Sequence, residues 1–261
     1  MCGIVGYVGD RDCADVLVDA LSKLEYRGYD SAGIAVFEKG TIKVEKCKGR
    51  LANLVDKMAV DGKPQGHCGI GHTRWATHGE PSDINSHPHG NKRVSIVHNG
   101  IIENYKQIKD FLIEEGYSFV SETDTETVAK LLDYYYVDDP VDTIIKVLAE
   151  IKGSYALGIM FRDYPDTVFA VRKESPLIVG VGENENFLAS DVPAIIKYTR
   201  DYYLLETNEI AVVKKDSISI YDMHKEPVHK EINTADWDVD AAEKGGYEHF
   251  MLKEIHEQPA A

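Results

Sequence analysis

Segments of strand length follow one another along the second half of this chain with almost no helix between them. Short apolar runs occur at residues 155–161, 167–172, 177–181, 186–190, 209–214 and 217–221, and one short helical segment at 192–198 interrupts them. Consecutive strands without intervening helices favour antiparallel pairing over a doubly wound parallel sheet. We therefore expect an α+β fold of layered sheets and helices.

The first half mixes strand and helix patterns. Strands are expected at 3–9 and 93–98, and residues 32–38 and 41–46 flank Lys39-Gly40 as the two arms of a hairpin. Apolar side chains recur at helical spacing over 12–26, 103–115, 124–137 and 141–152, with Gly28 and Gly116 as stop signals after the first two.

Charge and composition limit the classes of partner. The 261 residues carry 29 Lys and Arg against 44 Asp and Glu, a net charge of −15, which disfavours nucleic acid and anionic membranes as ligands. No apolar run reaches the roughly 20 residues of a membrane span, and we expect no signal peptide. The four cysteines form no C-x-x-C pair and are expected to be reduced thiols. We therefore expect a cytoplasmic protein.

The composition changes near residue 235. Residues 236–244 are polar and acidic, and Gly245-Gly246 follows them. Such a segment is typical of a linker. We therefore assign residues 1–235 to one domain and residues 236–261 to a linker towards a further part of the protein.

Cys2 is the most informative single residue. Because cysteine is small, removal of Met1 by ordinary processing is expected, and the thiol and a free α-amine would then belong to one residue. An α-amine has a pKa of about 7.7–8.0, which suits a general base near neutral pH, and a thiol is a strong nucleophile. If Met1 stays attached, the Cys2 nitrogen is an amide and cannot act as the base.

Four further residues fit an acyl-transfer site for a small charged substrate, and each has a plainer structural explanation. The Asn99 side chain and the Gly100 N–H can both donate to one oxyanion, although Asn-Gly is also a common turn dipeptide. Arg74 can bind a carboxylate through two parallel hydrogen bonds, although it can equally be a surface or core residue. Asp124 can bind an ammonium group, although Thr123 and Glu126 around it also form a capping-box pattern.

Familiar cofactor and hydrolase motifs are absent from the sequence. It has no G-x-G-x-x-G, phosphate-binding loop, G-x-S-x-G or H-E-x-x-H motif. A cluster of histidines includes a His-x-His pair, but no Cys pair or carboxylate stands at a matching spacing beside it (His72, His78, His87, His89, His98). We expect no metal and no cofactor, and histidines that pack and form hydrogen bonds in loops. His87 is given no catalytic role.

Five motifs together resemble a known family. They are residues 1–6 (MCGIVG), 26–33 (YRGYDSAG), 72–79 (HTRWATHG), 98–100 (HNG) and 123–126 (TDTE), in that order. The chain resembles, over essentially its whole length, the glutaminase domain of the glucosamine-6-phosphate synthase family. This domain is a class II glutamine amidotransferase of the N-terminal nucleophile hydrolase superfamily. Residues 75–78 and 249–255 favour this family over phosphoribosylpyrophosphate amidotransferases and asparagine synthetases.

The resemblance implies a fold and a set of roles. The fold is an αββα sandwich, in which two antiparallel sheets lie between layers of helices. Cys2 is the nucleophile and its α-amine the base, while Asn99 and Gly100 form the oxyanion hole. Arg74 and Asp124 hold the glutamine carboxylate and ammonium. The remaining implied residues are those of a loop that closes over glutamine and a structural arginine near the nucleophile (Trp75, Thr77, His78, Arg27).

The resemblance also implies a reaction and partners. The domain hydrolyses L-glutamine to L-glutamate and ammonia through a Cys2 thioester. In the full-length enzyme the ammonia passes to sugar-isomerase domains, absent from this sequence, which make glucosamine 6-phosphate from fructose 6-phosphate. The isolated domain is expected to be a monomer and the full-length enzyme a homodimer.

Two other functions stay open on the residues alone. A different hydrolase with an N-terminal cysteine, such as an amide acylase, would not need both Arg74 and Asp124. A binding domain without catalysis would not need Cys2, Asn99 and Gly100 together.

Overall fold

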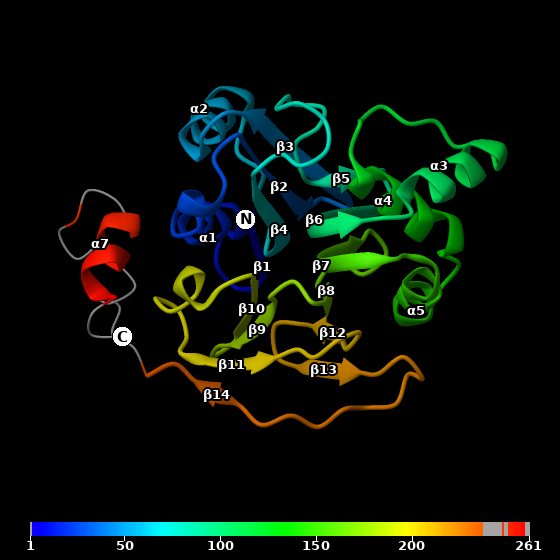
Figure 1. Cartoon of the computed structure of the whole chain (residues 1–261). Coiled ribbons are helices and arrows are strands. Elements are labelled where there is room, and N and C mark those ends of the chain that lie inside the picture. Colours follow the sequence, from blue (N-terminus) through cyan, green and yellow to red (C-terminus); the bar gives the residue numbers. More distant parts are fainter. Residues whose placement is uncertain (1, 237–246, 248–249, 259–261) are drawn as a thin grey trace.

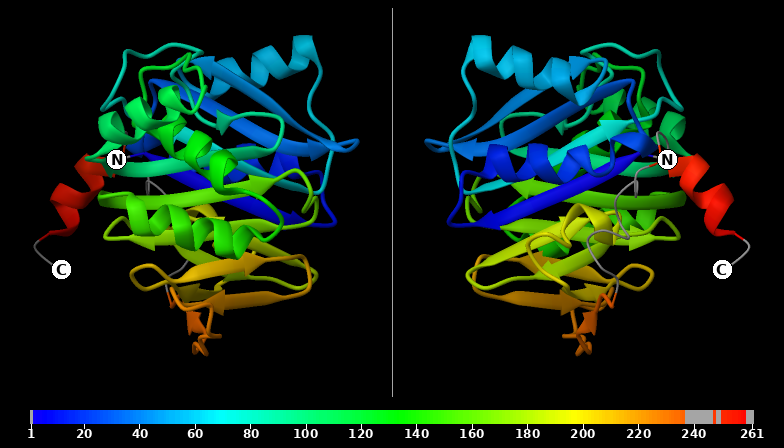
Figure 2. Two further views of the ribbon diagram at one scale, coloured as in Figure 1. Left: turned by 90° about the vertical axis from the view of Figure 1, so that its right-hand side faces the viewer. Right: turned by 90° about the vertical axis from the view of Figure 1, so that its left-hand side faces the viewer.

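The computed structural model describes residues 2–236, 247 and 250–258. Its strands form two sheets, in which every pair of neighbouring strands is antiparallel. The expected α+β class with antiparallel sheets is therefore confirmed. Helices α1 and α2 lie to one side of the sheets and α3, α4 and α5 to the other (Figures 1 and 2).

The first sheet has eight strands in the order β14-β11-β9-β10-β1-β4-β2-β3. In chain order they are β1 (Gly3–Gly9), β2 (Ser31–Glu38), β3 (Thr41–Lys48), β4 (Cys68–Arg74), β9 (Ile178–Val181), β10 (Glu185–Ala189), β11 (Asp201–Leu204) and β14 (Asn233–Thr234). The expected hairpin is β2–β3, with Glu38 opposite Thr41. In the centre of the sheet, β1 pairs with β4 so that Gly3 lies opposite Thr73.

The second sheet has six strands in the order β13-β12-β8-β7-β6-β5. They are β5 (His89–Gly90), β6 (Val94–Ile102), β7 (Gly153–Phe161), β8 (Val168–Lys173), β12 (Ile210–Val213) and β13 (Ile218–Tyr221). Strand β6 continues four residues beyond the expected end at His98, because residues 94–102 pair with β7 along their whole length. This extension places Asn99 and Gly100 inside a strand.

Three apolar clusters define four layers. One packs α1 (Cys13–Ser22) and α2 (Leu51–Asp61) on the first sheet, and a second packs α3 (Tyr105–Glu114), α4 (Asp124–Tyr135) and α5 (Pro140–Glu150) on the second. The third lies between the sheets and includes Ile4, Val97 and Ala156. Along β1, Val5 and Tyr7 face the helices while Ile4 and Val8 face the other sheet, as a period of two requires. The αββα arrangement is thus confirmed.

Several expected helix boundaries need correction. The first helix ends at Ser22 rather than at residue 26, and a 3₁₀ turn (Glu25–Arg27) follows, because three-residue hydrogen bonds such as that from the Leu24 N–H to the Leu21 carbonyl replace the helical ones. The segment expected as a helix at 192–198 is only a 3₁₀ turn, Val192–Ala194. The helix expected over 103–115 begins at Tyr105, the one over 124–137 ends at Tyr135, and the one over 141–152 ends at Glu150.

Within residues 2–236, the sequence-based expectation missed one helix and four strands: α2, β4, β5, β11 and β14. The signal for α2 was present, because Leu51, Leu54 and Met58 share its buried face and Gly62 ends it. Strand β4 reads Cys-Gly-Ile-Gly-His-Thr-Arg, with two glycines and three polar residues, yet all seven are buried. Tertiary contacts rather than strand propensity determine this strand.

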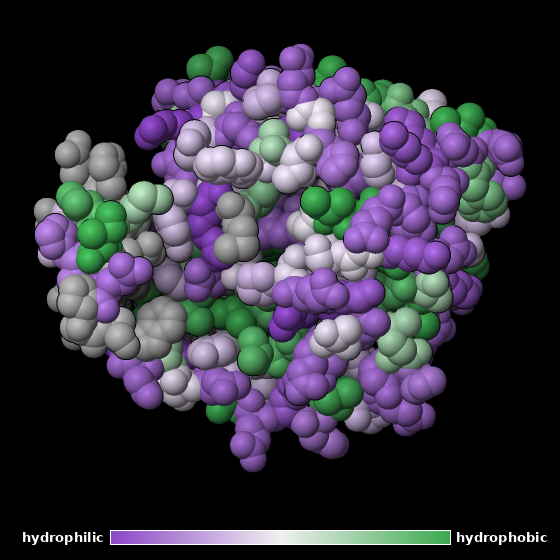
Figure 3. Space-filling model, in the orientation of Figure 1, coloured by the Kyte–Doolittle hydropathy of each residue, from purple (hydrophilic) through white to green (hydrophobic). Residues whose placement is uncertain are grey.

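The end of the chain is described only in part. Most of the linker predicted at 236–261 lies outside the described residues, and α7 (Phe250–Glu257) is the helix described within it. Figure 3 shows apolar side chains on α7, where Met251, Leu252 and Ile255 are exposed, and a mainly hydrophilic surface elsewhere on this face. Within the described ranges, no helix has the length and apolar character needed to cross a membrane.

Candidate active site

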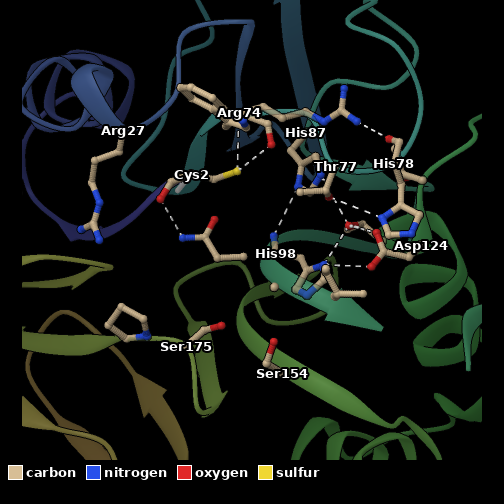
Figure 4. Close-up of a pocket in the computed structure, with 17 residues that line it drawn as sticks. Cys2, Arg27, Arg74, Thr77, His78, His87, His98, Asp124, Ser154 and Ser175 are labelled. Atoms are coloured by element: carbon tan, nitrogen blue, oxygen red, sulfur yellow. Dashed lines mark hydrogen bonds and ion pairs between the residues drawn. The ribbon is translucent and has the colours of Figure 1, made fainter. Parts of the chain in front are cut away.

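The register of the sheets brings the candidate residues to one end of the sandwich. Cys2 immediately precedes β1, and because Gly3 pairs with Thr73, Cys2 meets the chain where β4 ends at Arg74. Asn99 and Gly100 lie on β6 of the facing sheet, and Asp124 is the first residue of α4. All nine residues expected at the site line one cavity of about 320 Å³ (Figure 4; Cys2, Arg27, Arg74, Trp75, Thr77, His78, Asn99, Gly100, Asp124).

The Cys2 thiol lies against the backbone of Trp75. Its Sγ accepts a hydrogen bond from the Trp75 N–H at 3.1 Å. Burial raises the pKa of the thiol, and the Trp75 hydrogen bond opposes this only partly. The resting side chain is therefore a thiol that needs a base to become a nucleophile.

The amide of Asn99 faces Cys2. Its Nδ2 donates to the Cys2 carbonyl oxygen at 3.0 Å, and because an amide nitrogen carries two hydrogens, the second can be donated to an oxyanion. Gly100 has a φ of 128°, and a Cβ at this position would lie 2.1 Å from the Ser154 carbonyl oxygen. Only glycine therefore fits the backbone at position 100.

Arg74 is almost fully buried, and its guanidinium is only partly used. Nη2 donates to the carbonyl oxygens of His78 and, at 3.1 Å, Gly79. Nη1 is buried and has no hydrogen-bond partner among the described residues. Because a buried donor without a partner costs free energy, Nη1 is a natural place for a ligand acceptor. Burial lowers the pKa of Arg74, and Asp30, Cys2 and Asp124 oppose the shift.

Asp124 is held by the start of α4 and by β6. Its Oδ2 accepts from the Ile102 N–H at 2.8 Å, and the Thr123 hydroxyl caps the helix by accepting from the Glu126 N–H. The expected capping box is only half formed. The Glu126 carboxylate does not return to Thr123 but accepts from the N–H groups of Val120 and Ser121, so it orders the loop before the helix.

Arg27 and the 75–78 loop form other parts of the wall. Arg27 Nη1 is 2.7 Å from the Asp191 carboxylate in an ion pair. Trp75 is half-exposed, and its ring packs edge-on against Tyr29 at 5.5 Å between centroids. Thr77 is exposed and His78 half-buried. The loop thus lies at the mouth of the cavity.

Several lining residues were missed from the sequence. Eight more residues contribute to the wall (His87, His98, Ile101, Thr123, Thr125, Ser154, Ser175, Pro176). Ser154 lies opposite Ile101 in the β6–β7 ladder, and Ser175 follows β8, so these residues reach the site through strand pairing that no local motif encodes. His98 could have been predicted as a lining residue, because it directly precedes Asn99 in the sequence.

The expectation that the clustered histidines pack in loops was partly wrong. His72 and His89 lie in strands β4 and β5, and His98 lies in β6 as its strand prediction implied. The rings of His72 and His87 stack at 4.1 Å between centroids, and burial lowers the pKa of four of these histidines (His72, His87, His89, His98). Within the described ranges, no group of three His, Cys, Asp or Glu side chains is placed to hold a metal ion.

Comparison with known proteins finds a match to a known domain family. Residues 72–197 match the model of a glutamine amidotransferase domain. The chain therefore contains a glutamine amidotransferase domain. It is 59% identical over its whole length to the glutamine–fructose-6-phosphate aminotransferase (isomerizing) of Caldanaerobacter subterraneus, and 50% identical over 99% of its length to that of Thermus thermophilus. It spans 43% of the length of each of these relatives and corresponds to their N-terminal domain.

Solved structures agree on the fold. The amidotransferase domain is similar to the glutamine phosphoribosylpyrophosphate amidotransferase of B. subtilis, with a TM-score of 0.74 and 24% identity over 85% of this chain and 49% of that one. A second structure, an allosteric regulatory enzyme of purine biosynthesis, gives a TM-score of 0.75 at the same identity and coverage. At 24% identity, the similarity to these two structures supports the αββα fold that the sequence motifs implied. The roles of individual residues stay predictions.

Proposed function

We propose that this domain hydrolyses L-glutamine to L-glutamate and ammonia at Cys2. The observation that carries the proposal is that the Cys2 thiol, the Asn99 amide and the two opposite charges of Arg74 and Asp124 line a single cavity. A nucleophile and oxyanion donors serve amide cleavage, whereas the two charges suit the zwitterionic end of an amino acid.

The two charged residues are not paired with each other. No ion pair joins Arg74 to Asp124 in the described part of the chain, and Arg74 keeps an unpartnered Nη1. The α-carboxylate of glutamine binds Arg74 and its α-ammonium binds Asp124. This leaves the amide end of the side chain to reach Cys2, between the two sheets.

The reaction uses the α-amine that Cys2 gains when Met1 is removed. This amine takes the thiol proton, and Sγ attacks the amide carbon of glutamine. The oxyanion so formed is held by Asn99 Nδ2 and the Gly100 N–H. Collapse breaks the C–N bond, the leaving nitrogen takes the proton from the amine and departs as ammonia, and water then hydrolyses the Cys2 thioester to glutamate.

The remaining wall residues support this cycle. Trp75, Thr77 and His78 belong to a loop that closes over bound glutamine, and Arg27, fixed by Asp191, supports the wall beside the nucleophile. In the full-length protein, the ammonia passes to a sugar-isomerase part that makes glucosamine 6-phosphate from fructose 6-phosphate. Both the length of the relatives and the exposed apolar side chains of α7 support such a part.

We further propose that the protein is cytoplasmic. The isolated domain is a monomer, and the full-length protein is a homodimer.

The test is ammonia release from glutamine by the purified chain, together with its intact mass. A mass lacking Met1 and release that disappears in Cys2→Ala but persists in Cys47→Ala support the proposal. A chain that has lost Met1 yet releases no ammonia contradicts it. Equal turnover of glutamine and of simple acyl amides would instead favour an amide acylase.

A further inference from the structure

A buried histidine stands directly behind the Asn99 amide. His72 lies on β4 and is 1% exposed, and its ring reaches across to β6 of the facing sheet. Its Nε2 is 3.0 Å from Asn99 Oδ1 and 3.1 Å from the His98 carbonyl oxygen. The glutaminase proposal gives His72 no role.

The His98 carbonyl decides which ring nitrogen carries the hydrogen. A carbonyl oxygen can only accept, so Nε2 of His72 must be a donor. The Asn99 atom that faces the same Nε2 must then be an acceptor, which identifies it as Oδ1. It follows that Nδ2 is the atom that faces Cys2, in agreement with its 3.0 Å hydrogen bond to the Cys2 carbonyl.

This orientation matters because a primary amide is nearly symmetric in shape. If the Asn99 amide turned by 180°, Oδ1 would face the Cys2 carbonyl and any oxyanion formed there. Two acceptors would then repel each other, and the oxyanion would lose a donor. The shape of the pocket alone does not prevent this rotation, whereas a fixed donor on the far side does.

The environment also keeps His72 in a single protonation state. Nδ1 is buried and has no hydrogen-bond partner among the described residues, so a second proton would find no acceptor. Burial lowers the pKa of His72 to about 3, and the neighbouring His98 and Arg74 act in the same direction. The ring therefore carries one hydrogen near neutral pH, and the His98 carbonyl holds it on Nε2.

We propose that His72 is a positioning residue of the oxyanion hole: its Nε2–H, held by the His98 carbonyl, fixes the Asn99 amide with Nδ2 towards the reacting carbonyl. The inference rests on the proposed glutaminase function, because the oxyanion exists only in such a reaction. It predicts that His72 affects the rate of the chemical step mainly through Asn99.

A double-mutant cycle on the whole chain tests this prediction. His72→Leu removes the donor and should lower kcat for glutamine by about 10- to 100-fold with little change in KM, which is less than the loss of the whole Asn99 donor. His72→Gln, whose amide N–H can occupy the place of Nε2–H, should recover most of kcat. In an Asn99→Ala background, His72→Leu should change kcat by no more than about twofold.

The control is another buried histidine. His89 bonds to the Thr123 hydroxyl at 3.1 Å, and in the described part of the chain it has no hydrogen bond to Asn99 or Cys2. His89→Leu should destabilise the protein, but any effect on kcat should be the same in the wild-type and Asn99→Ala backgrounds. If His72→Leu also lowers kcat equally in both backgrounds, or if His72→Gln is as slow as His72→Leu, His72 is only a packing residue and the proposal is overturned.

A measurement without turnover separates this inference from the glutaminase proposal. Nitrogen-15 NMR of the resting wild-type protein should show His72 with a protonated Nε2 and an unprotonated Nδ1. The opposite tautomer overturns the positioning role even if the protein is an active glutaminase and even if the leucine variant fails to fold. The expected tautomer in a protein that releases no ammonia refutes the proposed function but keeps the assigned Asn99 orientation.

Discussion

Replacing Arg74 by lysine separates a glutaminase from a general amide hydrolase. The guanidinium has two ends in different surroundings: Nη2 holds the carbonyl oxygens of His78 and Gly79, while Nη1 is buried without a partner in the described part of the chain. A lysine ammonium is a single point charge. It can hold the loop carbonyls or meet the substrate carboxylate, but it cannot reproduce the planar fork that does both.

The size of the effect follows from the hydrogen bonds lost. One hydrogen bond involving a charged group contributes about 1.5–3 kcal/mol, and each 1.4 kcal/mol corresponds to a tenfold change in an equilibrium constant. We therefore expect Arg74→Lys to raise KM for glutamine by about 10- to 100-fold. Because the carboxylate contact exists in both the ground state and the transition state, kcat should fall much less.

The assay compares two substrates with two proteins. Glutamine and its α-carboxamide, which lacks the carboxylate charge, are each turned over by the wild type and by Arg74→Lys, with kcat/KM measured for all four pairs. The wild type should have a low kcat/KM for the carboxamide, and Arg74→Lys should lower that kcat/KM only slightly further. Arg93→Lys is the matched control, since Arg93 pairs with Asp133 away from the cavity.

An equal penalty on both substrates would refute the reasoning. It would mean that Arg74 acts by holding the loop at His78 and Gly79 rather than by contacting the carboxylate. The plainer structural interpretation of Arg74 would then be the better one.

Three other outcomes are expected. Cys2→Ala should abolish ammonia release, whereas alanine at each of the other cysteines should leave the chemical step intact, because only Cys2 can carry a free amine beside its thiol. Asn99→Ala should lower kcat by about 10²–10³-fold with little change in KM, and a large rise in KM at constant kcat would make Asn99 a ground-state binder. Burial lowers the pKa of His72 to about 3 and holds the pKa of His87 and His89 well below the ordinary value, so these three rings take up protons on unfolding. Stability should therefore fall as pH drops below about 6.5, by about 1.4 kcal/mol per pH unit for each proton taken up. The free energy of unfolding in urea, measured at pH 7 and pH 5, checks this. His89→Gln should reduce its dependence on pH by the amount expected for about one proton.

The parts of the site that could be predicted from the sequence are those whose position depends on residues nearby in the chain. Thr123 caps α4 through its own side chain, and that cap alone places Asp124 at the first helical position. The apolar run before Asn99 predicts a strand that leads into it. The role of Cys2 was predicted from its position in the chain alone, because a free α-amine there requires only the removal of Met1.

The parts that could not be predicted depend on distant pairing. Strand β4 has too many glycine and polar residues to resemble a buried strand, and it is buried because β1 and β2 pair with it on both sides. The orientation of the Asn99 amide depends on His72, 27 positions away and in the other sheet. No periodicity or motif carries such a contact.

The buried histidines also bear on the proposed preference of the cavity for a zwitterion. Arg27 has its charge balanced by Asp191 at 2.7 Å, and His87 and His98 stay neutral because burial lowers the pKa of each ring. Among the described lining residues, Arg74 and Asp124 therefore remain as the two charges that we propose bind the carboxylate and the ammonium group. A protonated ring beside Arg74 would add a second positive charge, favour plain anions and weaken the match to an amino acid. The lowered pKa of these rings thus fits the proposed preference for an amino acid, because a neutral ring adds no positive charge beside Arg74.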